Sequence, residues 1–430
     1  MKHRVIKALI LPLALASLSV SLSGCSKTSD PLIVWTFTKE LKTMIEDYYL
    51  KANPKANVSI QTIELNSMKQ KLALAIQTGK HVPDLVALEA QVVQSFTEQD
   101  YLADLQSIID TGATDDMYSY TKDVATNPKG EVVGLSWQAT PGGFFYRADL
   151  AADKLGITTP EQMQEHVKDW ASYLALAQSC VDNGLKISSS MTDSIKVFLS
   201  ERSNAWVKKE DGKTKLVLDN VMFGNTDASV TNCYDTLKTI QQGGMSNETE
   251  DRGPGWFSDI SGSKVLSYFC SSWGLYYDLK ANAKTTDGHW AMCKGPSNYY
   301  NGGTWLSVLK TSKHLDEAKA MVKYFTTDVD FLSAWGKAND DFMNNKKVMA
   351  KMKENYSCSF LGGQNHLNIL YEVADAIKGD LISPYDSGIN SDFTSFAADY
   401  AMQKRTITRE DSIDQFSKKV VSTYPSISLA

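Results

Sequence analysis

The chain has 430 residues and a net charge of −6, from 44 basic and 50 acidic side chains. An acidic chain lacks the basic surface that nucleic-acid phosphates require, so its charge argues against a nucleic-acid partner. A chain of this length also exceeds what one hydrophobic core usually supports, so we expect two domains.

The first 25 residues contain a basic start, an apolar run and a segment of small residues that ends in cysteine. A basic start, Met1–Lys7, precedes an uncharged apolar run, Ala8–Val20, that is too short to span a bilayer stably. The run leads into Leu22-Ser23-Gly24-Cys25, which resembles the lipobox of bacterial lipoproteins. This resemblance implies a signal peptide over 1–24, lipid on the Cys25 thiol, and a mature chain at the outer face of the cytoplasmic membrane. The alternative is an ordinary signal peptide in which the cysteine is incidental.

Two further properties describe the mature chain. Removal of 1–24 takes away three basic residues and no acidic one, so the charge changes from −6 to −9. No second apolar run approaches the ~20 residues of a membrane helix. We therefore expect a soluble body on a short polar tether, 25–31.

Five cysteines remain besides the predicted lipid site. Without a Cys-x-x-Cys pair, a zinc site or thioredoxin-like chemistry has no support. Cys270 and Cys293 could form a disulfide, but we favour buried free thiols. The five are Cys180, Cys233, Cys270, Cys293 and Cys358.

Strands and helices alternate at the start of the mature chain. Apolar runs predict strands at 32–37, 58–62 and 83–88, and apolar residues at helical spacing lie between them, from Leu41 to Tyr49 and from Met68 to Ile76. This alternation is typical of βαβ units with a parallel sheet.

The order of these elements resembles the extracellular solute-binding proteins of bacterial carbohydrate ABC transporters. The similar segments are the turn Thr78–Asp84, then Gly130–Leu135, Phe144–Arg147 and Gly156–Pro160. Ser136 stands where the family usually has proline, and Arg147 where it usually has asparagine. The resemblance implies an α/β, two-lobed periplasmic-binding-protein-like fold with a hinge and a ligand cleft between the lobes.

The later elements fit this plan. Thr159 and Pro160 predict a helix start, and Asp211-Gly212 predicts a hairpin turn within 208–218. A strand is expected at 264–269, and Ser312 is expected to cap a helix. Terminal helices are expected at 372–377 and 416–421.

We assign 32–147 and 298–342 to lobe 1, and 148–297 and 343–430 to lobe 2. Each lobe is expected to have a mostly parallel sheet. Segments near 146–150, 290–299 and 339–346 are expected to cross between the lobes.

Ligand-binding side chains are expected in loops that follow strands, because the cleft of an open α/β sheet lies past the carboxyl ends of its strands. Aromatic rings can stack on sugar rings, and carboxylates and amides can match sugar hydroxyls. The candidates are Trp35, Glu40, Glu89, Trp137, Gln138, Trp256, Trp273, Trp305, Tyr299, Gln364 and Asn365.

Each candidate also has a structural interpretation. A tryptophan often belongs to the core, and we expect this of Trp170 and Trp335. We favour Trp273 and Trp305 as ligand contacts because each adjoins a glycine turn that resembles a ligand-facing family segment. Glu89 is the favoured carboxylate, although it could simply begin a helix.

Catalysis has little support in the sequence. The chain has no zinc-protease, serine-hydrolase, phosphate-loop or calcium-loop motif. A glycosidase needs two carboxylates that flank the scissile bond, and acidic pairs such as Asp340-Asp341 do not show this. We expect no enzyme activity, no cofactor and no metal.

The sequence thus predicts a monomeric substrate-binding lipoprotein that passes an oligosaccharide to ABC permease subunits. A peptide or a polyol is the alternative ligand for the same fold. From other classes, a surface lipoprotein enzyme acting on polysaccharide and an adhesive lipoprotein without a small ligand remain alternatives.

Overall fold

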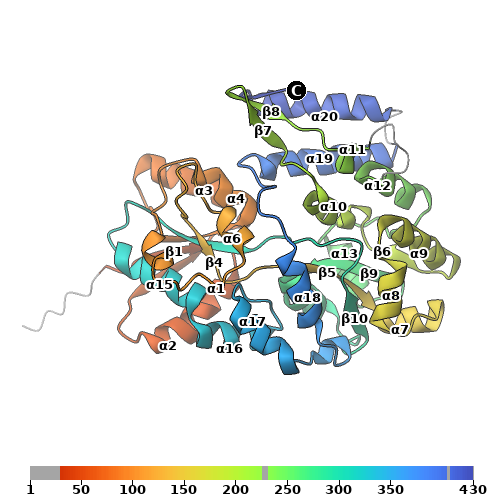
Figure 1. Ribbon diagram of the computed structural model, residues 1–430, viewed down its shortest axis with the longest axis horizontal. Helices are drawn as coiled ribbons and strands as arrows, with labels where there is room; N and C mark the ends of the chain where they lie inside the picture. Colours follow the sequence, from red (N-terminus) through yellow and green to blue (C-terminus); the bar gives the residue numbers. More distant parts are fainter. Residues whose placement is uncertain (1–29, 225–230, 404–406, 430) are drawn as a thin grey trace, which may run out of the picture.

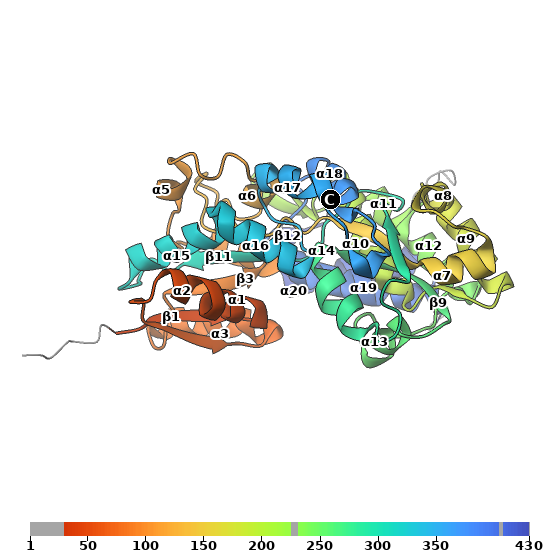
Figure 2. The same ribbon diagram turned by 90° about the horizontal axis from the view of Figure 1, so that it is seen from below.

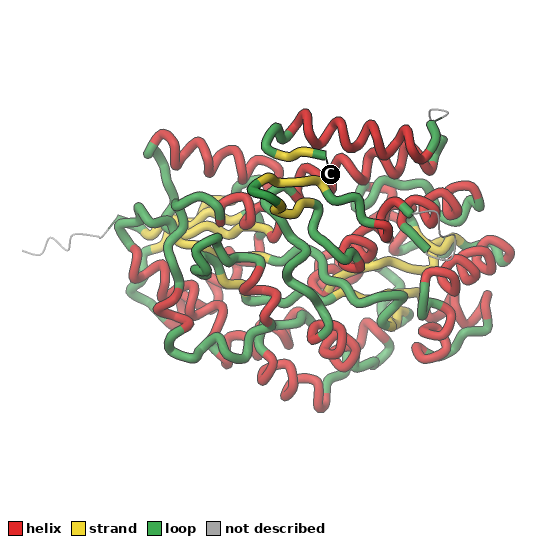
Figure 3. Tube along the Cα trace, turned by 45° about the horizontal axis from the view of Figure 1, so that its top comes forward, coloured by secondary structure: helices red, strands yellow, loops and turns green. Residues whose placement is uncertain are grey.

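The computed structural model describes residues 30–224, 231–403 and 407–429, so the predicted signal peptide and Cys25 lie outside the described residues. Two lobes lie side by side in both ribbon views (Figures 1 and 2). In each lobe helices surround a central sheet (Figure 3).

The first lobe is built on a five-stranded sheet with the order β2-β1-β3-β11-β4. Its strands are β1 (Leu32–Thr36), β2 (Val58–Thr62), β3 (Leu85–Glu89), β4 (Leu135–Ser136) and β11 (Thr304–Val308). β1 runs parallel to β2 and β3, whereas β11 runs antiparallel to β3 and β4. The predicted βαβ start of the chain is therefore confirmed.

Helices cover this sheet. They are α1 (Lys39–Met44), a π-helical continuation (Ile45–Tyr49), α2 (Leu50–Ala52), α3 (Leu65–Thr78), α4 (Ala90–Thr97), α5 (Gln106–Ile109), α6 (Ser119–Asp123), α15 (Leu315–Thr327) and α16 (Val329–Asn339). α3 ends where Gly79 takes a left-handed φ of 65°. Ser312 does not cap α15 as expected: its hydroxyl accepts from the His314 amide, two residues on, and donates to Asp84.

The second lobe contains a four-stranded sheet with the order β10-β5-β9-β6. Its strands are β5 (Gly142–Arg147), β6 (Lys186–Ser188), β9 (Val265–Ser271) and β10 (Trp290–Cys293). Only β6 and β9 are parallel, so the expectation of a mostly parallel sheet is wrong for this lobe. The strand β5, which we placed in lobe 1, pairs here with β9 and β10.

Two hydrophobic clusters, one that contains Trp170 as expected and one, shared with the first lobe, that contains Trp256 and Leu275, lie under the helices of the second lobe. The helices are α7 (Ala148–Leu150), a π-helical segment (Ala151–Leu155), α8 (Pro160–His166), α9 (Trp170–Asp182), a 3-10 turn (Met191–Ser194), α10 (Ile195–Glu201), α11 (Asn220–Phe223), α12 (Cys233–Gln242), α13 (Pro254–Ile260), α14 (Ser272–Gly274) and a π-helical segment (Leu275–Lys280).

The predicted hairpin forms between β7 (Val207–Glu210) and β8 (Lys213–Leu216), and β12 (Ile427–Ser428) joins it. Asp211 and Gly212 have φ of 51° and 73°, as a tight hairpin turn of this kind requires.

The C-terminal part of the chain adds further helices. They are α17 (Lys346–Met352), 3-10 turns at Lys353–Asn355 and Ser359–Leu361, α18 (His366–Asp375), α19 (Asp386–Ala401) and α20 (Arg409–Thr423). α17 and α18 join a core cluster that also contains side chains of both sheets. α19 and α20 join the core of the second lobe instead.

Three chain segments cross between the lobes. The first runs from β4 to β5, a few residues before the position expected from sequence, and the second from β10 to β11. The third runs from α16 to α17 and contains Met343. Isolated bridges join Gln138 to Met343 and Pro141 to Tyr300, so the three crossings are tied together. Such a bundle of crossings is suited to act as a hinge.

Candidate functional site

Cavities open where the two lobes face each other. Cavity A has a volume of about 760 Å³ and is lined from the first lobe by α1, α3 and the end of β3, and from the second lobe by Arg252, Trp273 and Tyr277. Cavity B has a volume of about 560 Å³ and lies between α10, α13, the end of β9 and α19. The two share Gln91, Arg252, Trp273, Asn301 and Ser387, so they form adjoining parts of one cleft.

A smaller cavity, cavity C, has a volume of about 60 Å³. Glu89 borders it from the first lobe, and Lys196, Arg202 and Asp386 border it from the other side. Arg202 is buried, forms an ion pair with Asp386 at 3.5 Å, and donates to the Leu381 carbonyl.

Five of the predicted ligand-binding residues line these cavities. Glu40, Glu89, Gln138 and Trp273 line cavity A, and Trp256 and Trp273 line cavity B. The structure thus brings together side chains that are up to 233 positions apart in sequence, from Glu40 to Trp273.

Trp273 is fixed at the junction of cavities A and B. Its indole N–H donates to the Asn301 carbonyl at 2.8 Å, and Gly302 lies so close that a Cβ there would meet the indole nitrogen at 3.1 Å. The guanidinium carbon of Arg252 lies 4.9 Å from the ring centroid, in a cation–π contact. The half-buried ring is therefore held on one side by an arginine.

Arg252 is held in turn by Asp278. Its Nη1 forms an ion pair with Asp278 Oδ2, and its backbone has a left-handed φ of 57°, a strained value for a residue with a side chain. Burial raises the pKa of Asp278 to about 6, although the charge of Arg252 acts in the opposite direction. The Arg252 side chain is 42% exposed, so its remaining N–H groups can reach a ligand.

Lys196 is the second cation of cavity B. Its ammonium lies 2.6 Å from Asp193 and 3.7 Å from Asp251, and it donates to the Phe269 carbonyl at 3.2 Å. Burial would lower the pKa of this lysine, but the two carboxylates outweigh burial and raise it. Lys196 is therefore a fixed positive charge at the cavity wall.

Glu89 begins α4 and points its carboxylate at the cleft. Its Oε2 accepts from the Gln91 amide at 2.8 Å, as a helix cap does. Burial raises the pKa of Glu89 to about 7, and the hydrogen bonds from the backbone of α4 oppose this only partly. Glu89 therefore begins a helix, as one interpretation from sequence states, and it also lines cavities A and C, while its contact with a ligand stays a prediction.

Glu40 lies beside a second buried carboxylate, Asp341. Burial, followed by the charge of Asp341, raises the pKa of Glu40, and the nearby Trp137 and Trp335 indoles offset this in part. Asp341 accepts from Ser272 at 2.6 Å. These contacts join the first lobe, a crossing segment and the second lobe beneath cavity A.

Gln138 lines cavity A as well, and its amide donates to Asp341 at 3.3 Å. The same crossing segment therefore supplies both a wall residue of the cavity and a partner for the buried carboxylate pair.

Four predicted aromatic contacts lie in the core instead. Trp35, Trp137, Trp305 and Tyr299 are at most 5% exposed, and none lines cavity A, B or C. The Trp305 indole donates to the Thr121 carbonyl at 2.7 Å. The Tyr299 hydroxyl is held at 2.9 Å from the Gly143 carbonyl. The sequence placed these residues near strand ends, but their side chains point into the hydrophobic core and not into the cleft.

Gln364 and Asn365 lie away from the cleft. The Gln364 side chain accepts from the Met292 amide at 2.9 Å and donates to its carbonyl at 2.7 Å. The Asn365 amide donates to the Lys353 carbonyl at 2.6 Å. Both side chains bind the backbone of neighbouring segments, so we do not include them in the proposed site.

Sequence reasoning missed most of the cavity B wall. The residues concerned are Gln91, Lys196, Arg252, Asp278 and a row of hydroxyl and amide side chains on α19. The row on α19 could have been recognised in the sequence as uncharged polar residues at helical spacing. In contrast, no local sequence pattern indicates that Lys196 or Asp278 lines a cavity.

Three further properties of the described residues concern cysteines, metal binding and membrane spanning. The five cysteines that the structure describes are all buried and free, as we favoured. Over 30–224, 231–403 and 407–429, no three potential ligands among His, Cys, Asp and Glu are grouped as a metal site requires. Over the same ranges, no helix is both long enough and apolar enough to cross a membrane.

Solved structures with similar folds were found, whereas a search of curated proteins found no match. One is a crystal structure of an extracellular solute-binding protein of family 1, with 17% identity, a TM-score of 0.77, and coverage of 91% of this chain and 99% of that one. A second is an ABC-transporter-associated binding protein of B. animalis subsp. lactis in complex with β-1,6-galactobiose, with 18% identity, a TM-score of 0.74, and coverage of 93% and 99%.

A third is the galacto-N-biose/lacto-N-biose I-binding protein of Bifidobacterium longum in complex with lacto-N-biose, with 16% identity, a TM-score of 0.73, and coverage of 93% and 99%. At these identities the similarity concerns the fold. The sequence profile of one family matches residues 35–330, more than half of the chain. The protein therefore belongs to the bacterial extracellular solute-binding proteins.

Proposed function

We propose that this protein is the substrate-binding component of an ABC importer, and that it captures an oligosaccharide between its lobes for delivery to a membrane permease. The observation that carries the proposal is the cleft formed by cavities A and B, where Trp273 is surrounded by charged, amide and hydroxyl side chains. An aromatic ring can stack on the apolar face of a sugar ring, and polar side chains can match its hydroxyls. The family and the sugar complexes of two similar folds support this ligand class.

The arrangement of the walls suggests how a ligand would favour the closed form. Glu89 and Gln91 come from the first lobe, whereas Arg252 and Trp273 come from the second. A ligand that contacts both walls binds better when they approach, so it shifts the lobes towards closure about the crossing segments. The loaded form would then be the one that the permease recognises.

The family places the protein outside the cytoplasm. We further propose that it is a monomer, anchored by lipid on Cys25 at the outer face of the cytoplasmic membrane. The motif at Leu22–Cys25 supports this anchor. Metabolic labelling with a fatty-acid analogue, compared between the natural chain and Cys25→Ala, tests it: label on both chains would rule out this thiol.

We propose binding without turnover. The family and the similar folds are binding proteins, and a glycosidase would need two carboxylates placed on either side of the scissile bond. Glu40 is held beside Asp341 and Glu89 caps a helix, so each carboxylate has a structural role besides lining cavity A.

Isothermal titration calorimetry tests the proposal on the soluble protein that begins after Cys25. The panel contains plant, starch and host oligosaccharides, the matching monosaccharides, short peptides and polyols. The expected result is micromolar binding of an oligosaccharide, no product after long incubation, and loss of binding in Trp273→Ala.

Other results would identify the alternatives. Heat from peptides or polyols alone would keep the fold and reject the sugar class. Release of shorter sugars would show an enzyme. No ligand-induced heat or stabilisation across the panel would favour an adhesive role.

A further inference from the structure

The two faces of α19 differ sharply. One face carries Ile389, Phe393 and Ala397, which are fully buried in the core of the second lobe. The other face carries four hydroxyl side chains and one amide that line cavity B. These residues, which we call the α19 polar face, are Ser387, Asn390, Ser391, Thr394 and Ser395.

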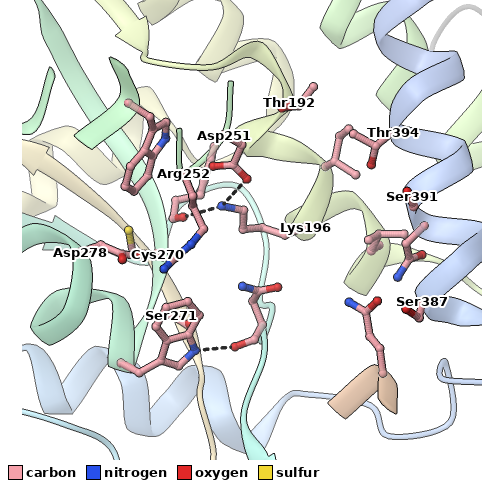
Figure 4. Close-up of a pocket in the computed structure, with 18 of the residues that line it drawn as sticks. Thr192, Lys196, Asp251, Arg252, Cys270, Ser271, Asp278, Ser387, Ser391 and Thr394 are labelled. Carbon is pink, nitrogen blue, oxygen red and sulfur yellow. Dashed lines mark hydrogen bonds and ion pairs between the residues drawn. The ribbon is translucent and has the colours of Figure 1, made fainter. Parts of the chain in front are cut away.

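The spacing of the α19 polar face places its side chains in a row. Ser387 and Ser391 are four residues apart, and Thr394 and Ser395 follow on the same side of the helix. In Figure 4, Ser387, Ser391 and Thr394 lie along one helix and face Arg252, Asp278 and Ser271 across the open space. The row from Ser387 to Ser395 extends over slightly more than two helical turns, or about 12 Å at 1.5 Å per residue.

The four hydroxyls have no partner within the described part of the protein, although helical hydroxyls often bond to the preceding turn. Thr326 and Ser417, on other helices, donate in this way to the carbonyls of Val322 and Ile413 at 2.8 and 2.7 Å. The α19 hydroxyls therefore keep both their donor and their acceptor capacity for whatever enters cavity B.

The opposite wall of cavity B also contains buried polar groups that have no partner among the described residues. They are the Ser271 hydroxyl, Asp278 Oδ1 and the Trp256 indole N–H. Each of these residues is at most 2% exposed. A buried polar group without a partner is costly, and this set contains both donors and acceptors.

The charges around cavity B are balanced. Lys196 and Arg252 line it together with Asp251 and Asp278, so the cationic and anionic side chains are equal in number. Asp193, behind the wall, adds one further carboxylate next to Lys196. A ligand with its own negative charge would meet cations that are each already paired with a carboxylate, whereas a neutral ligand rich in hydroxyls could bond to the wall without disturbing these pairs.

We propose that the α19 polar face determines the ligand specificity of this cleft. Its side chains would form hydrogen bonds to the hydroxyls of a neutral, unsubstituted sugar unit held between α19 and the Arg252–Trp273 stack. The proposal rests on the proposed function and names the part of the oligosaccharide that enters cavity B. α19 begins at Asp386, beyond residue 330, where the family profile match ends. Ligand choice would thus be set by a segment outside that match.

The test uses the soluble protein that begins after Cys25 and the tightest-binding neutral oligosaccharide from the calorimetric panel. Ser391→Ala combined with Thr394→Ala removes two hydroxyls from the wall. The expected result is a loss of affinity of about tenfold or more, because each lost hydrogen bond contributes modestly. Ser391→Trp places a bulky ring in cavity B and is expected to abolish binding.

Matched controls separate the wall from general effects. Ser179→Ala combined with Thr239→Ala removes two exposed hydroxyls of α9 and α12, both of which bond to their own helices. This control is expected to bind like the natural protein. An oligosaccharide of the same linkage with a uronic acid at one end is expected to bind at least tenfold more weakly.

The outcomes distinguish the two proposals. If Trp273→Ala loses binding while the Ser391 and Thr394 variants keep it, the α19 wall is refuted and the oligosaccharide function stands. Tighter binding of the acidic sugar would refute the neutral-ligand inference. If no sugar binds at all, both proposals fall.

Discussion

The pH dependence of stability tests the environment of Glu89. Burial raises its pKa in the folded protein from an ordinary 4.5 to about 7. The folded state therefore holds this proton more firmly than the unfolded state, so its stability relative to the unfolded state falls as pH rises from 4.5 to 7. At 1.36 kcal/mol per pH unit, the full shift corresponds to about 3 kcal/mol, and exposure of the side chain to cavity water should reduce this to about 1–2 kcal/mol.

Glu89→Gln removes the titration and keeps an oxygen that can accept from the Gln91 amide. Thermal unfolding of the soluble protein is compared with the variant at about pH 4.5 and about pH 8. The variant should match the natural protein at the lower pH and have a melting temperature about 1–2 °C higher than the natural protein at the higher pH. Glu98→Gln, at the exposed end of the same helix, is the control and should show no such change. A difference between protein and variant that is the same at both pH values would refute the inferred burial of the carboxylate.

Four further substitutions separate packing from binding. Trp305→Ala should destabilise the fold by about 3–5 kcal/mol, measured by denaturant unfolding, and should leave the affinity of the folded protein unchanged. Trp273→Ala should instead affect binding more than stability: ligand affinity should fall at least tenfold in calorimetry, and the melting temperature should change little. Gly142→Ala should prevent normal folding, because its Cβ would lie 2.1 Å from the Tyr299 ring. In Gly156→Ala the new Cβ meets no atom within 4 Å, so this change should cost only about 1–2 kcal/mol of stability for its left-handed φ of 70°. Equal yields of soluble protein from the two variants would contradict this packing.

Local patterns were sufficient for the βαβ start of the first lobe, but not for the antiparallel pairing of β3 with β11. Its early strands are buried apolar runs separated by amphipathic helices, and each boundary has a local cause such as Thr38 at the start of α1 or Gly79 at the end of α3. The second sheet could not be predicted in the same way. Its pairing of β5 with β9 joins strands more than 100 residues apart, and no local signal states whether such strands run parallel or antiparallel.

The direction of a side chain was harder to predict than its position. Trp305 does lie beside a glycine turn, as expected, but it pairs in register with Leu88 of β3, so its ring joins the apolar face of the sheet. Trp273 follows its strand by two residues, in the short helix α14, and its ring reaches the cleft. Two similar motifs therefore place tryptophan in opposite environments, because one lies within a strand and the other beyond its end.

The α19 polar face shows which kind of signal the sequence did contain. A solvent-facing helix usually carries charged residues opposite its apolar face. In α19 the apolar positions Ile389, Phe393 and Ala397 alternate with a face made of serine, threonine and asparagine, and that face carries no charge. Such residues are weak helix formers, so their use on an exposed face is not favoured by helix stability. Uncharged hydrogen-bonding side chains with a poor helical propensity therefore indicate a helix face that contacts a polar, neutral partner other than bulk water. We assign this role of polar, neutral partner to the ligand of cavity B.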